Sequence, residues 1–302
     1  MSPFKRKTNI RLKSLVALAS FIVIFLLSIG APFITQARPV GDVSAYLATS
    51  PPPAPTSTPF AYVANMYSNS VSVINTTTNA VTATVAMSLP YGVAITPDGA
   101  AVYVTNFSGN SVSVISTATN TVTNTISVGV GPNKPAVTPD GSKVYVPNGT
   151  SGTVSVISTA TKTVIATVSG VGDARDVAIT PDGARAYLAR ANGNSISVVS
   201  TSTNTVTSTI DVGGYSLGIA VTPNGNFAYV SVRVGGVPAN GVVAVIDTNS
   251  ASPTFNTVVA TIQVGALSGG NITSVAVTPD GSRVYVVSNN SNALHVINTA
   301  NN

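Results

Sequence analysis

Thr96-Pro97-Asp98-Gly99 decides the fold, because this four-residue sequence recurs along the chain at regular intervals. Further copies begin at Thr138, Thr180 and Thr278, and a variant with asparagine in place of the aspartate begins at Thr222. The first four begin at residues 96, 138, 180 and 222, a spacing of 42 residues, and the last follows after 56. A period of about 40–50 residues indicates one supersecondary unit stacked several times.

The unit around the first copy reads as four β-strands, which we call A, B, C and D. Residues 92–96 and 102–105 flank the Pro-Asp-Gly turn, and residues 111–116 alternate serine with valine or isoleucine. Residues 121–128 follow a second polar turn. Four antiparallel strands repeated in this way predict an all-β fold, a β-propeller of four-stranded antiparallel blades.

The number of blades depends on two incomplete ends. A partial unit starting at Phe60 supplies strands B, C and D, and the last unit, residues 273–302, supplies A, B and C. Because a propeller closes to remove its sheet edges, we predict six blades, with part of residues 43–49 filling a missing strand. Five blades plus an irregular end is the alternative. The extra residues of the fifth unit are expected in loops between strands, where insertions cost little.

The first 37 residues have the layout of a secretory signal. Five basic residues up to Lys13 precede an uncharged apolar stretch at about residues 15–34, and small residues end at Ala37. We predict residues 1–37 as a signal peptide, or as an N-terminal membrane anchor if uncleaved, and an extracytoplasmic protein, secreted or attached to the cell surface. Residues 38–59 are rich in proline and predict a disordered spacer before a propeller domain at residues 60–302.

Beyond this signal the charges balance. Of the 14 lysines and arginines, five lie in the first 37 residues, whereas all nine acidic residues are aspartates that follow them. Nine basic residues therefore face nine acidic ones from Arg38 onward. Nucleic-acid binding needs a basic surface on the folded domain, so we do not expect it.

The residue types that ordinary catalysis needs are scarce. His295 is the single histidine, and the chain has no cysteine and no glutamate to act as a second metal ligand or acid–base partner. The aspartates of the repeated turn are predicted to bond local backbone amides. Six tyrosines share one B-strand position and are predicted to pack in the core with bonded hydroxyls: Tyr62, Tyr103, Tyr145, Tyr187, Tyr229 and Tyr285. We predict no catalytic residue, metal or cofactor, and hence a protein that is not an enzyme.

Tyr103-Val104-Thr105-Asn106, in its setting of the repeated turn before and an alternating strand after, resembles the YVTN family of propeller repeats. Weaker copies stand at residues 145–148, 187–190 and 285–288, and the resemblance covers residues 60–302. It implies a surface-layer or cell-surface propeller that acts in interactions at the envelope, which is an analogy at the level of fold. Some propellers that are similar to this one hydrolyse lactones or carry redox cofactors, usually with His, Glu and Arg in the central channel.

Residues that depart from the repeat indicate one candidate binding face. The D–A and B–C loops share a face, because each blade runs up and down twice, and varied loop residues are candidates for binding. One D–A position is held in successive units by Gly92, Lys134, Asp176, Gly218 and Ser274. The binding-face candidates are Tyr91, Asn133, Lys134, Arg175, Asp176, Arg190, Tyr215 and Arg233.

The favoured function is a binding or structural interaction module whose partner is a cell-envelope polymer, a glycan or a surface protein. A membrane would be contacted only through the N-terminal segment, if that segment is uncleaved. One alternative is a lactonase-like hydrolase, which would need Asp173, Arg175 and Asp176 to converge at the channel. The other alternative is a passive surface-coat repeat protein.

Overall fold

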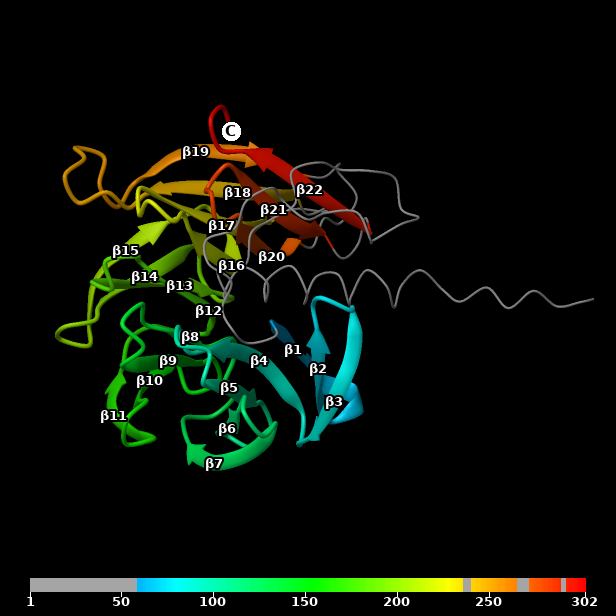
Figure 1. The fold of residues 1–302 in the computed structure, drawn as a ribbon. Coiled ribbons are helices and arrows are strands. Elements are labelled where there is room, and N and C mark those ends of the chain that lie inside the picture. The colour runs from blue at the N-terminus through cyan, green and yellow to red at the C-terminus, as the bar shows by residue number, and fades with distance from the viewer. Residues whose placement is uncertain (1–58, 236–239, 265–271, 289–291) are drawn as a thin grey trace, which may run out of the picture.

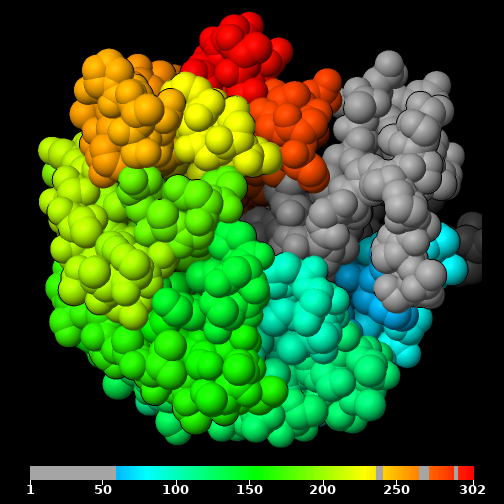
Figure 2. Space-filling view, turned by 60° about the vertical axis from the view of Figure 1, so that its left-hand side comes forward, coloured from blue at the N-terminus to red at the C-terminus, as the bar shows by residue number. Residues whose placement is uncertain are grey.

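Six antiparallel sheets follow one another around a central axis in the computed structural model, which describes residues 59–235, 240–264, 272–288 and 292–302 (Figure 1). The colours of the chain run in sequence order around the molecule from one sheet to the next (Figure 2). The prediction of a six-bladed propeller is confirmed. Residues 1–58, with the predicted signal, spacer and closing segment 43–49, lie outside the described residues. Within the described ranges, no helix is both long and apolar enough to cross a bilayer.

The first three blades have the following strands. Blade 1 consists of β1 (Phe60–Asn65), β2 (Ser70–Asn75) and β3 (Ala80–Ala86), with the short helix η1 (Met66–Ser68) between β1 and β2. Blade 2 consists of β4 (Pro90–Ile95), β5 (Ala101–Asn106), β6 (Ser111–Ser116) and β7 (Thr121–Ser127). Blade 3 consists of β8 (Ala136–Val137), β9 (Lys143–Asn148), β10 (Thr153–Ser158) and β11 (Thr163–Val168).

The last three blades complete the ring. Blade 4 consists of β12 (Ala174–Ile179), β13 (Arg185–Arg190), β14 (Ser195–Ser200) and β15 (Thr205–Asp211). Blade 5 consists of β16 (Tyr215–Val221), β17 (Phe227–Val234), β18 (Asn240–Asp247) and β19 (Val258–Gln263). Blade 6 consists of β20 (Ile272–Val277), β21 (Arg283–Ser288) and β22 (Ala293–Asn298).

Two details differ from the sequence-based expectation. Part of the extra length of the fifth unit extends β17 and β18 to eight residues each instead of lying in the loop, because pairs such as Val232↔Val242 continue the antiparallel ladder. In blade 3 the innermost strand β8 has only two residues. It begins directly after Pro135, which has no N–H to donate to a ladder.

The repeated turn is held by hydrogen bonds of its own. Thr138 Oγ1 donates to Asp140 Oδ1 at 2.6 Å, the Ser142 amide donates to the same oxygen at 3.0 Å, and Gly141 takes a φ of 73°. In blade 5, Asn224 Oδ1 accepts the equivalent bond from Thr222 at 2.7 Å. The prediction that these aspartates serve turn geometry is confirmed by this substitution, because the amide makes the same bonds without a charge.

These turns make stability depend on pH. Hydrogen bonding, chiefly from the Thr138 hydroxyl, lowers the pKa of Asp140 to about 2, and the pKa values of Asp98, Asp182 and Asp280 are lowered by the equivalent threonines. An aspartate whose pKa is lower in the folded state stabilises the fold above the unfolded pKa of about 3.9 and loses that contribution as pH falls.

We therefore expect the denaturant midpoint to fall between about pH 4 and pH 2. Changing all four aspartates to asparagine, the residue that blade 5 already carries, is expected to flatten this dependence. The measurement is guanidinium denaturation across that pH range for both chains. Equal slopes in the two chains would contradict the assignment.

Five of the six shared tyrosines are buried between blades, as predicted, whereas Tyr285 is only half-buried. Tyr62, Tyr103, Tyr145, Tyr187 and Tyr229 are at most 1% exposed. Four of the hydroxyls donate to an asparagine Oδ1 in the C–D turn of the next blade, in the pairs Tyr62–Asn120 (2.7 Å), Tyr145–Asn204 (2.7 Å), Tyr187–Asn256 (2.6 Å) and Tyr229–Asn302 (2.8 Å). All four asparagines have a positive φ, between 48° and 59°, which is the left-handed conformation that asparagine tolerates.

Tyr103 is the exception, because the equivalent turn of blade 3 carries Lys162 at a φ of 55°. Among the described residues the Tyr103 hydroxyl has no partner. Changing Lys162 to asparagine is expected to raise the free energy of unfolding by about 1 kcal/mol, through a new hydrogen bond and a better left-handed residue. Guanidinium denaturation measures the gain. In a Tyr103→Phe background the hydrogen-bond part should vanish, and an undiminished gain there would contradict the pairing.

Candidate functional site: the central channel and its mouth

A cavity of about 900 Å³ lies along the propeller axis. Its wall is formed by aliphatic side chains of the innermost strands β4, β8, β12, β16 and β20: Val93, Ile95, Val137, Val177, Ile179, Ile219, Val221, Val275 and Val277. It extends to Tyr62 and Ala64 of β1, because the described part of blade 1 has no innermost strand. At the corresponding distance before β1, residues 49–54 include three prolines, which carry no N–H for a ladder.

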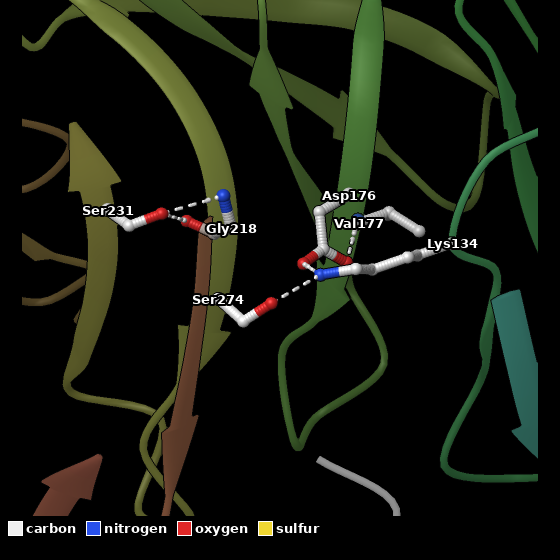
Figure 3. Close-up of polar contacts among 6 residues, drawn as sticks. All are labelled: Lys134, Asp176, Val177, Gly218, Ser231 and Ser274. Carbon is white, nitrogen blue, oxygen red and sulfur yellow. Dashed lines mark hydrogen bonds and ion pairs between the residues drawn. The ribbon is translucent and has the colours of Figure 1, made fainter. Parts of the chain in front are cut away.

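Three side chains from different blades meet at the mouth of this cavity (Figure 3). Lys134 Nζ lies 3.2 Å from Asp176 Oδ2 and donates to Ser274 Oγ at 3.1 Å. Lys134 precedes β8 in blade 3, whereas Asp176 is on β12 in blade 4 and Ser274 is on β20 in blade 6. Blades 3 and 6 stand opposite each other in a ring of six, so the lysine side chain spans the channel. We call these three residues the mouth cluster.

The register of the innermost strands brings these side chains inward. In β12 the pairing with β13 shifts between Ala174 and Asp176, and in β20 it shifts between Ile272 and Ser274. A β-bulge of this kind turns the side chain that follows it. Blades 2 and 5 have the same shift but carry Gly92 and Gly218, whose amides donate to hydroxyls of the neighbouring B strand instead.

The mouth cluster is largely shielded from water. The Lys134 and Asp176 side chains are 20% and 13% exposed. Burial raises the pKa of Asp176, and the neighbouring Lys134 ammonium opposes this rise. The Val177 amide donates to Asp176 Oδ1 at 3.0 Å and holds the carboxyl in place. The cluster is therefore a nearly buried ion pair with no net charge.

Of the residues next to the mouth cluster, Arg175 lines the cavity, whereas Asp173 and Asn133 do not. Arg175 pairs with Asp173 Oδ2 at 2.7 Å. Of the three residues that the hydrolase alternative requires, the structure brings Arg175 and Asp176 to the channel. Asn133 is fully buried and its amide donates to the carbonyls of Gly131 and Ala174, so it lies behind the face.

Of the remaining candidates, Tyr91 lines the cavity, whereas Arg190, Tyr215 and Arg233 do not. Tyr215 is 46% exposed and stands opposite the exposed Arg233 in the β16–β17 register. Arg190 is half-buried, and its Nη1 donates to Ser195 Oγ at 3.1 Å. The Tyr91 ring packs against Phe107 with centroids 5.8 Å apart.

One exposed aromatic residue of this face was missed by the sequence analysis. Tyr67 in η1, between strands B and C of blade 1, is 94% exposed. The signal that could have found it is a tyrosine in a B–C connection, a place where no other blade has a tyrosine. His295, on β22, is half-buried at the outer side of blade 6, and the described residues contain no group of three metal-ligating side chains.

These features define a β-propeller repeat protein with an axial channel. A family model described as a YNCE-like beta-propeller matches residues 98–214. The structure of Kuenenia stuttgartiensis hydrazine synthase is similar at 20% identity and a TM-score of 0.54, over 80% of this chain and 92% of that one.

A functionally unknown protein from Desulfotomaculum acetoxidans DSM 771 is similar at 21% identity and a TM-score of 0.68, over 79% of this chain and 75% of that one. At these identities both structures show the fold alone. No curated protein matches the chain. The class is thus a β-propeller repeat protein.

Proposed function

We propose that this protein is an exported cell-surface propeller of the YVTN type, which binds an envelope glycan, polymer or surface protein through its D–A/B–C face. The observation that supports this most is the gathering of exposed aromatic and cationic side chains on that face. Tyr67, Tyr215 and Arg233 are exposed there, and Tyr91 and Arg175 stand at the channel rim. Tyrosine and arginine are the residue types enriched at binding interfaces.

The opposite face supports the choice by contrast. It is formed by the repeated Thr-Pro-Asp-Gly turns, whose polar side chains are largely used in bonds within the turn, as Thr138 with Asp140. A near-identical turn in blade after blade offers little from which a specific site could be built, whereas the D–A/B–C face differs in every blade. Varied loops on a regular scaffold are where binding residues concentrate.

The test is binding of the chain from Arg38, which keeps every described strand, to isolated cell envelopes. Arg175→Glu/Arg190→Glu/Arg233→Glu is expected to abolish saturable binding. The matched control is Lys143→Glu/Lys162→Glu/Arg283→Glu, which reverses three charges at the other end of the blades. It should bind as the parent does.

Since Arg175 is paired with Asp173, a second variant uses exposed positions only: Tyr67→Ala/Tyr215→Ser/Arg233→Glu. Loss of binding in both face variants, with unchanged circular dichroism, supports the proposal. Equal loss in the control would overturn the face assignment. No binding by the parent would leave the passive surface coat as the better description.

The second candidate is a lactonase-like hydrolase, and the mouth cluster is the observation that favours it. Asp176, with its raised pKa, is a carboxyl placed beside Lys134 on the wall of a cavity that could hold a small substrate. Asp173, engaged by Arg175, is then a supporting group. Turnover of a lactone series by the parent, abolished in Asp176→Asn, would support this candidate, and absence of turnover in the parent would remove it.

A further inference from the structure

One N–H donor of the Lys134 ammonium in the mouth cluster is not used by the described residues. A lysine ammonium carries three N–H donors. Lys134 gives one to Asp176 and one to Ser274, and the described residues offer no partner for the third. An acceptor that enters the channel mouth therefore meets a donor that needs no rearrangement of the protein.

The channel below the cluster is mainly apolar, and Thr138 and Thr278, which also line it, have hydroxyls bonded to Asp140 and Asp280. Valine and isoleucine side chains from the five innermost strands form the wall below the cluster. At the end where the repeated turns lie, the cavity is lined by Pro97, Pro139, Pro223 and Pro279, which have no N–H to donate. An apolar cavity with a few polar groups at one end is the usual form of a small-molecule site.

We propose that the channel binds an uncharged amphipathic molecule, with an aliphatic body among the inner strands and a hydroxyl or carbonyl head that accepts the third N–H of Lys134. This site lies inside the channel and does not rest on the binding face proposed above. Its ligand is identified by charge and polarity, so the charges that face the mouth decide which head group fits.

Among the residues that the structure describes, three charged side chains line the cavity: Lys134, Asp176 and Arg175. Each of them is paired with an opposite charge. Lys134 and Asp176 pair with one another, and Arg175 pairs with Asp173. A carboxylate head would add an unmatched negative charge next to Asp176, and an ammonium head would add an unmatched positive charge next to Lys134. An unmatched charge is strongly disfavoured in a largely dry site, whereas a neutral head leaves the balance intact.

The test uses four probes with the same ten-carbon chain: decanol, methyl decanoate, decanoate and decylammonium. Each competes with a neutral fluorescent probe, N-phenylnaphthylamine, for the chain from Arg38. We expect the alcohol and the ester to displace the probe, and both charged compounds to bind at least about tenfold more weakly.

Two variants test the role of the cluster. Asp176→Asn keeps the shape but leaves the Lys134 charge unmatched, so the preference should invert toward decanoate. Lys134→Met/Asp176→Leu removes the lysine donor and both charges without adding a new donor. Decanol should then lose its advantage over decane. Ser274→Ala, which keeps the ion pair and releases one more N–H, is expected to keep the preference for neutral heads.

Other controls separate this proposal from the first. Val93→Trp narrows the channel at a half-buried wall position and should abolish probe binding without a change of charge. Tyr67→Ala/Tyr215→Ser/Arg233→Glu should leave probe binding intact while envelope binding is lost. Failure of the parent to bind the probe, equal affinity for all four head groups, or no inversion in a folded Asp176→Asn chain would each overturn the proposal.

Discussion

Replacing Gly92 by valine is expected to lower the free energy of unfolding by about 3 kcal/mol or more. A Cβ atom at this position would lie 2.6 Å from Lys134 Cα and 2.6 Å from Pro135 Cδ. One is a backbone atom and the other belongs to a proline ring, so neither can swing away as a flexible side chain does. Blades 2 and 3 would have to separate at the channel mouth, which would also displace Lys134 from the mouth cluster.

Gly99→Ala is the control. At Gly99 an added side chain would be disfavoured by the positive φ of the backbone and not by a clash with neighbouring atoms. Its φ is 69°, and no atom among the described residues lies within 4 Å of an added Cβ. The alanine should therefore cost about 1–2 kcal/mol, the usual penalty of a left-handed residue. Guanidinium denaturation of both variants distinguishes the two causes. A loss at Gly92 no larger than at Gly99 would contradict the steric argument.

Tyr187→Ala is expected to cost about 3–5 kcal/mol, since it removes a fully buried aromatic ring between blades 4 and 5. The ring is 0% exposed and belongs to the same cluster as Ile219 and Val230 of blade 5. Neighbouring inner and outer strands cannot close such a gap without shifting a whole sheet. Thermal and denaturant unfolding of this variant should show a large loss of stability.

Tyr187→Phe separates the ring from its hydroxyl. It keeps the packing and loses only the hydrogen bond to Asn256, so a cost of about 1 kcal/mol is expected. Burial raises the pKa of Tyr187 to about 12, so its ionisation signal should be missing from the parent's absorbance titration below that pH. Equal losses for alanine and phenylalanine would show that the hydroxyl, and not the ring, holds the two blades together.

The fold could be predicted largely from the repeat, and particular residues show why. The Thr-Pro-Asp-Gly turn and the strand-B tyrosine recur because every blade needs the same local hydrogen bonds and the same packing, as Asp140 and Tyr145 illustrate. Such requirements are local or involve only the next blade, so they leave a periodic pattern. The length of the innermost strand of blade 3 was less predictable, because Pro135 shortens β8 at a position where the repeat suggests a full strand.

The site could be predicted only in part. Lys134, Asp176 and Ser274 share one D–A repeat position, which marked them as residues of one face of the propeller. Which of them would meet depends on the bulges before Asp176 and Ser274 and on blade 6 standing opposite blade 3, and neither is visible in a periodic pattern. For Asn133 the sequence was misleading. Its place in a varied loop suggested an exposed side chain, whereas the structure buries that side chain against backbone carbonyls.

The four tyrosine–asparagine bonds of the described residues all run from one blade to the blade that follows it in the sequence, which has a consequence for the order of folding. The Tyr62 hydroxyl can bond Asn120, and the Tyr229 hydroxyl can bond Asn302, only after the ribosome has added a further 58 and 73 residues, respectively. At a synthesis rate of about 5–20 residues per second, a blade would remain with an open flank for roughly 3–15 s before its neighbour arrives. We therefore expect the blades to fold in order from the N-terminus during synthesis, each one providing the surface against which the next one packs.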